Sequence, residues 1–140
     1  MSPAVAAALA GEHAAVFAYG VIGPRLGGGL ASAARAAEEA HRARRDAVLV
    51  ALSAAGETPA PAEPAYALPF PVTDRAAALR LAVHVEERTA ALWRAALPET
   101  AGADRRRALD SLTDCALRAA RWRRAAGRRP GTTPFPGAPG

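Results

Sequence analysis

Carboxylate and imidazole side chains stand at the centre of otherwise apolar helical stripes, at spacings that suit metal binding between helices. His41 lies on a stripe of alanine, valine and leucine, and Glu38 precedes it by one helical turn. A Glu and a His at positions i and i+3 on an inward helix face are half of the carboxylate-bridged metal site found in helical bundles. Glu12 and Glu86 take the same mid-stripe position in two other stretches. Since an unpartnered buried acid is unfavourable by several kcal/mol, these side chains require partners.

Two kinds of partner are compatible with this pattern. Arg45 follows His41 by one turn on the same stripe, and its guanidinium offers five fixed donors that can satisfy two carboxylates where a cation would otherwise sit. The favoured interpretation is therefore a buried polar network of Glu12, His41, Arg45 and Glu86, completed by Asp114. A mononuclear metal site is the alternative, and a working di-iron centre has the least support.

The composition predicts that helices alone position these residues. The chain has 140 residues, of which 51% are hydrophobic and only 5% aromatic. Most of the hydrophobic residues are alanine, which suits closely packed helices and, because β-branched residues are few, does not suit a sheet. The length is that of one domain that can bury a core without disulfides. We expect an all-α fold.

Capping residues, glycines and prolines divide the chain into four predicted helices and a tail. Helices are expected at 3–22, 30–55, 74–97 and 104–127, which together form one domain over 1–127, followed by a Pro/Gly-rich tail at 128–140. Residues 56–72 separate the second and third helices, and their proline content excludes a helix there. Extended at about 3.1 Å per residue this segment reaches roughly 45 Å, more than the length of a 25-residue helix of about 37 Å. It can therefore act as a crossover that lets the second and third helices run parallel.

The order of two helices, a long crossover and two more helices, with an acid or histidine at the centre of the first three stripes, resembles the ferritin-like superfamily. Residues 10–20, 40–46, 66–72 and 112–114 resemble, more closely, a small bacterial ferritin-like family classed as a domain of unknown function. The resemblance spans nearly the whole chain. It implies a ferritin-like four-helix bundle with a proline-rich crossover, and it names no reaction.

The resemblance also implies a set of metal ligands, which this sequence matches in part. Ferritin-like di-iron proteins place a Glu on the first and third helices and a Glu-x-x-His on the second and fourth. Glu12, Glu38 with His41, and Glu86 match the first three elements. The fourth helix offers Asp114 and has no histidine, so the second metal position lacks ligands.

Two hypotheses about function follow. The first is a non-catalytic ferritin-like domain with an arginine-carboxylate core and no cofactor, which acts through protein association, including association with a second copy. The second is a metal-binding protein that holds iron or manganese and handles iron or performs redox chemistry. We expect no enzymatic activity under the first hypothesis, and the sequence leaves the choice open.

Charge, cysteine content and hydropathy bear on partners and location. All 18 basic residues are arginine, and the formal charge is +5; several arginines near Trp122 follow the outside of a helix, so specific nucleic-acid binding is not expected. Cys115 is the only cysteine, which favours a reducing compartment and a buried apolar role. No stretch is expected to span a membrane, and the cytoplasm is the predicted location. His13 and His84 are expected at the helix surface, partly exposed.

Overall fold

The computed structural model describes residues 1–128, 132 and 134–139, and over this part of the chain it contains four long helices and no strand. The long helices are α1 (Pro3–Ile22), α2 (Gly28–Ala54), α3 (Arg75–Ala96) and α4 (Gly102–Ala125). Two short 3-10 helices, η1 (Gly23–Arg25) and η2 (Leu97–Glu99), follow α1 and α3. The prediction of an all-helical fold is confirmed for these residues.

Local sequence signals explain where the helices begin and end. The Ser2 hydroxyl accepts the Val5 N–H at 3.1 Å, and Pro3 occupies the first turn of α1, where no backbone donor is needed. Asp74 caps α3, where its side chain accepts the Ala77 N–H at 2.8 Å. Gly56 follows α2 with a φ of +76°, a conformation that ends helices and favours glycine.

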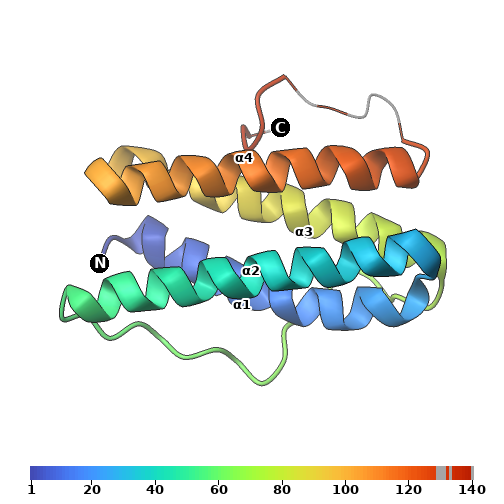
Figure 1. Ribbon diagram of the computed structural model, residues 1–140, viewed down its shortest axis with the longest axis horizontal. Helices are drawn as coiled ribbons and strands as arrows, with labels where there is room; N and C mark the ends of the chain where they lie inside the picture. Colours follow the sequence, from blue (N-terminus) through green and yellow to red (C-terminus); the bar gives the residue numbers. More distant parts are fainter. Residues whose placement is uncertain (129–131, 133, 140) are drawn as a thin grey trace.

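The segment between α2 and α3 returns the chain along the length of the helices. Figure 1 shows α2 and α3 running in the same direction, with residues 55–74 passing beneath α1 and α2 from one end of the molecule to the other. We call residues 55–74 the strap. Tyr66 of the strap lies against Phe17 of α1, with ring centroids 5.8 Å apart, and Arg80 of α3 lies over the Phe70 ring. These contacts hold an otherwise irregular segment on the helices.

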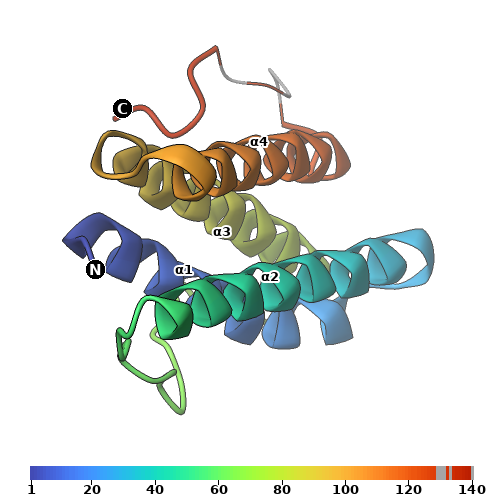
Figure 2. The same cartoon turned by 60° about the vertical axis from the view of Figure 1, so that its left-hand side comes forward.

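The helices enclose two separate apolar clusters, one toward each end of the molecule. α1 packs against α2 and α3, and α3 packs against α4, as both views show (Figures 1 and 2). One cluster includes Tyr19, Ile22, Leu79 and Trp122, and the other includes Leu9, Val48, Leu52, Trp93 and Cys115. Polar side chains lie between them, at the middle of the four helices.

One expected core position proved wrong. Leu109 shares a helical stripe with Leu112, Ala116 and Ala119, a spacing that predicts an apolar face there, but its side chain is 49% exposed, and Ala108, Ser111 and Cys115 face inward beside Leu112. α4 is thus rotated about its axis relative to the expected orientation.

The first helix is long and apolar. Residues Pro3–Arg25 are long enough, and with a mean hydropathy of 1.5 apolar enough, to cross a membrane by length and composition alone. The expectation that no stretch spans a membrane stays a prediction. Half of that stretch is buried inside the protein, and core helices pass the same test.

Candidate functional site

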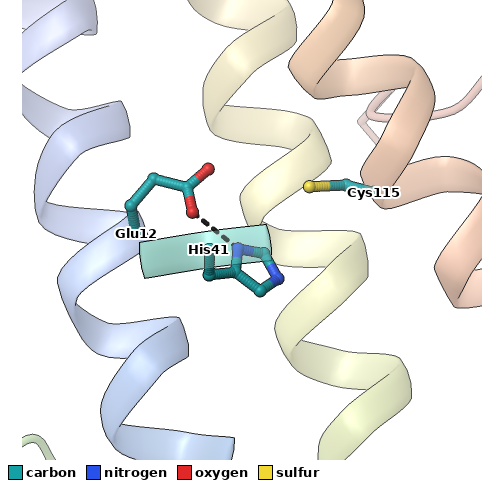
Figure 3. A group of neighbouring side chains, drawn as sticks. All are labelled: Glu12, His41 and Cys115. Atoms are coloured by element: carbon teal, nitrogen blue, oxygen red, sulfur yellow. Dashed lines mark hydrogen bonds and ion pairs between the residues drawn. The ribbon is translucent and has the colours of Figure 1, made fainter. Parts of the chain in front are cut away.

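Three ionisable side chains from three helices meet between the two apolar clusters. Glu12 of α1, His41 of α2 and Glu86 of α3 are each 0% exposed. His41 Nδ1 lies 2.5 Å from Glu12 Oε2, and His41 Nε2 lies 2.8 Å from Glu86 Oε1. The imidazole therefore bridges two carboxylates, one of which is drawn with it in Figure 3.

The carboxylates determine the protonation state of the imidazole. Burial alone would lower the pKa of His41, but the hydrogen bonds to Glu12 and Glu86 outweigh it and raise the pKa to about 9. Burial also opposes ionisation of Glu12, yet His41, Arg44 and Trp93 hold the pKa of that carboxyl below its usual value. At neutral pH the group is an imidazolium that donates one hydrogen bond to each carboxylate.

Aromatic side chains donate further hydrogen bonds to both carboxylates. Trp93 Nε1 donates to Glu12 Oε1 at 2.7 Å, and the Tyr19 hydroxyl donates to Glu86 Oε1 at 2.6 Å. Trp122 Nε1 in turn donates to the Tyr19 hydroxyl oxygen at 2.8 Å. All four helices thus contribute to one continuous hydrogen-bonded chain, in which only Glu86 Oε2 has no partner among the described residues.

Two arginines link this chain to the fourth helix. Arg44 donates to Glu12 Oε1 at 3.1 Å and to Asp114 Oδ2 at 2.5 Å. Arg118 donates to Asp114 at 2.7 Å, and its Nε lies 4.0 Å from Glu86 Oε1. Arg44, Arg118 and protonated His41 therefore face three carboxylates, so the formal charges of the cluster balance.

Cys115 lies at the edge of the cluster. Its Sγ accepts a hydrogen bond from Arg44 at 3.5 Å, and Figure 3 shows the sulfur directed from α4 toward Glu12 and His41. One ligand atom from each of Cys115, Glu12 and His41 lies within 4.8 Å of the other two. Burial raises the pKa of Cys115 well above its ordinary value, so the group is a thiol at neutral pH.

Comparison with known proteins places the chain in a family. Residues 4–140 match the family described as a domain of unknown function, DUF4439. The chain belongs to this family. The DUF4439 chain is also similar to the crystal structure of a conserved hypothetical protein, rv2844, from Mycobacterium tuberculosis, with 41% identity and a TM-score of 0.84. That match covers 87% of this chain and 93% of the mycobacterial one. No curated protein matches this chain.

In this DUF4439 domain, four of the six residues expected at the site lie together. Glu12, His41 and Glu86 are in direct contact, and Asp114 reaches the cluster through an arginine. Glu38 lies outside the cluster, where it pairs with Arg42 at 2.8 Å on the surface.

The arginine in the cluster is Arg44, and not the expected Arg45. Arg45 turns away and donates to Asp46 at 2.9 Å, because a single residue step rotates a side chain by about 100° around the helix. Both positions are about one turn from His41, so the spacing could not separate them.

His13 is likewise not at the surface: it is only 9% exposed, and neither of its ring nitrogens has a partner among the described residues. His84 is exposed, as expected.

Sequence reasoning did not assign a role to several residues of the site. Trp93 and Tyr19 lie on apolar helical stripes of the sequence, a position that predicts core packing alone, although a buried indole or phenol normally finds a hydrogen-bond partner. Each lies seven residues, or two turns, after the buried acid of its own helix and donates to the acid of the other helix. The signal that could have identified them was therefore the pairing of a buried aromatic donor with each buried acid.

Proposed function

We propose that this chain is a non-catalytic ferritin-like helical domain whose core holds cationic side chains where ferritin-like proteins hold metal ions. The path of the chain supports the ferritin-like assignment: α2 and α3 run in the same direction, and the strap joins them along the length of the molecule (Figure 1). The central position of the acids on α1 and α3 also agrees with that architecture.

The donor set does not fit a dinuclear metal centre. His41 uses both ring nitrogens on carboxylates, which leaves it no lone pair for a metal while it is protonated. Arg44 occupies an oxygen of Glu12, and Arg118 lies beside Glu86. In place of a Glu-x-x-His pair, α4 supplies Asp114, itself held by two arginines, and the protonated thiol of Cys115.

The observation that carries the proposal is the doubly bonded imidazolium of His41. A single proton on the ring gives the cluster the positive charge that a metal would otherwise bring to two facing carboxylates. With the charge balanced and the polar atoms nearly all paired, the site offers no open position at which a substrate could react. We therefore assign the domain a role in protein association in the cytoplasm, with a second copy of the chain as one partner. Sedimentation of the purified protein tests this association by measuring its oligomeric state.

Metal analysis tests the proposal directly. The protein is purified without chelator, loaded anaerobically with ferrous iron or manganese, passed through gel filtration and assayed for metal content. We expect far less than one equivalent of metal per chain and a melting temperature that a chelator does not change. Retention of one or two equivalents, lost in Glu12→Gln, would contradict the proposal, whereas metal retained equally by that variant is bound elsewhere.

A mononuclear metal site is the second candidate, and two observations favour it. Glu86 Oε2 is buried and has no partner within residues 1–128, 132 and 134–139, and Cys115 Sγ lies near Glu12 and His41. One iron or manganese ion held by these groups would require His41 to lose a proton, so binding would strengthen as pH rises. One retained equivalent per chain with that pH dependence would establish this candidate in place of the first.

A further inference from the structure

A cavity whose lining contains none of the polar-core residues lies between the strap and the groove formed by α1 and α3. Its volume is about 370 Å³, near the lower end of the range for small-molecule sites. The floor is formed by small residues of α1, among them Ala14 and Ala18, and by Leu81 and Val85 of α3. Small side chains on α1 leave the space, and the strap forms one wall of it, with the rest open to solvent.

The roof of this cavity is held in place at both ends. Tyr66 packs on Phe17, and its hydroxyl accepts the backbone N–H of Glu63 at 2.9 Å. Four residues further along, Phe70 packs on the apolar cluster beneath it and carries Arg80 on its ring. Tyr66 and Leu68 therefore form a fixed wall above the floor.

The rim of this cavity carries positive charge and no negative charge. His84 and Arg88, one turn apart on the exposed side of α3, both line the cavity, and none of the residues lining it is acidic. Within the described part of the chain, neither side chain makes an ion pair or a side-chain hydrogen bond. Arg123 on α4, in contrast, is paired with Glu87 of α3, and Arg88 differs from the exposed arginines of α4 because it lines this hollow. An unpaired guanidinium beside an apolar hollow is suited to bind a carboxylate.

We infer that the cavity beneath the strap binds a small carboxylate with a flat apolar body. The body would lie on the alanines of α1 against Tyr66, and the carboxylate would meet Arg88 and His84 at the rim. The volume suits roughly 10 to 15 non-hydrogen atoms, which corresponds to an aromatic acid and excludes a long acyl chain or a nucleotide. This site shares no residue with the polar core, and binding there is independent of any metal.

Calorimetry with 2-naphthoate as the probe tests the inference on the full chain. We expect binding with one site per chain, weakened about tenfold in Arg88→Gln and lost in Ala14→Leu, which fills the floor. The matched control is Arg106→Gln, which removes the same charge from an exposed position of α4 and should leave the affinity unchanged. The cation 2-naphthylmethylammonium has the same apolar body and should not bind.

Amide chemical shifts locate the bound probe and identify variants that fail to fold. Addition of 2-naphthoate should shift the amides of Gly11, Val85 and Ala67, and the spectrum of each variant without probe reports its folding. Absence of binding at millimolar probe, an affinity equal in Arg88→Gln and wild type, or shifts confined to another surface would each overturn the inference. None of these outcomes depends on the result of metal analysis.

Discussion

At the scale of single residues, the main chemical feature of this protein is the positive charge of the buried His41 ring. A buried imidazolium is unusual because burial favours the neutral ring, and here two carboxylates reverse that preference. Its charge is therefore a property of the fold, and it is lost on unfolding or when the proton is removed.

The first prediction is that stability falls as pH rises through about 9. The pKa of His41 is about 9 in the folded protein and about 6.5 in the unfolded chain, so the folded state binds more protons between these values. The contribution is fully present below about pH 6.5 and amounts to about 3 kcal/mol. Urea unfolding at pH 7 and pH 10 measures it, and His41→Gln should remove most of the difference. If His41→Gln loses as much free energy of unfolding between pH 7 and pH 10 as the wild type, other groups cause the loss.

The second prediction distinguishes two adjacent arginines. Arg44→Ala should lower the free energy of unfolding by about 3 kcal/mol, because it leaves Glu12 buried with one donor fewer and separates Asp114 from the core. Arg45→Ala should change it by less than about 1 kcal/mol, since Arg45 pairs only with the exposed Asp46. Denaturant unfolding of both variants provides the comparison. A larger effect of the Arg45 substitution would show that the two side chains exchange roles in solution.

The third prediction concerns acid stability and His13. Burial, together with the nearby Arg45, lowers the pKa of His13 below its ordinary value. The unfolded chain therefore takes up the proton more readily, and stability declines as pH falls below about 6.5. His13→Leu should reduce the drop in melting temperature between pH 7 and pH 5. An unchanged drop would indicate that the ring is solvated and contributes nothing to acid sensitivity.

At the scale of the helices, the alanine-rich composition explains both what the sequence predicts and what it does not. Helix boundaries follow from caps such as Ser2 and glycines such as Gly56, and these signals are local, so they can be read without the fold. The rotation of a helix is set by its apolar stripe, and alanine occurs on every face of these helices. Leu109 and Arg45 were both misassigned for this reason, each by a single residue step.

The fourth prediction tests the close approach of α1 and α3. A Cβ at Gly11 would overlap Leu92 Cδ1, so an alanine there displaces the end of a flexible side chain. In a Leu92→Ala background that contact is gone, and Gly11→Ala should then stabilise the protein by about 1 kcal/mol through helix propensity alone. In the wild-type background the gain should be smaller or absent. A double-mutant cycle by urea unfolding measures the coupling, and a coupling near zero would mean that the helices are further apart than described.

At the scale of the whole molecule, the polar cluster divides the core into two apolar parts. Its inner members were found from the sequence because acids are conspicuous among alanines, whereas its outer members, Arg118 and Trp122, come from a helix whose rotation the sequence did not determine. The remaining question at this scale is why a small protein keeps a layer of charged groups, three of them fully buried, across its core, since apolar replacements of buried ion pairs often leave proteins equally stable.

The charged layer distinguishes one alignment of the helices from all others. Alanine faces are nearly interchangeable, so a helix displaced along its axis by one turn of about 5.4 Å would bury almost the same surface. The same displacement would set Glu12 and Glu86 against alanines and leave His41 without acceptors, which makes every shifted alignment unfavourable. We expect a variant with leucine at these three positions to keep its helical circular dichroism and to lose the dispersion of its amide resonances. The polar cluster would then specify a single register of the helices, within an apolar core that by itself permits several registers of nearly equal energy.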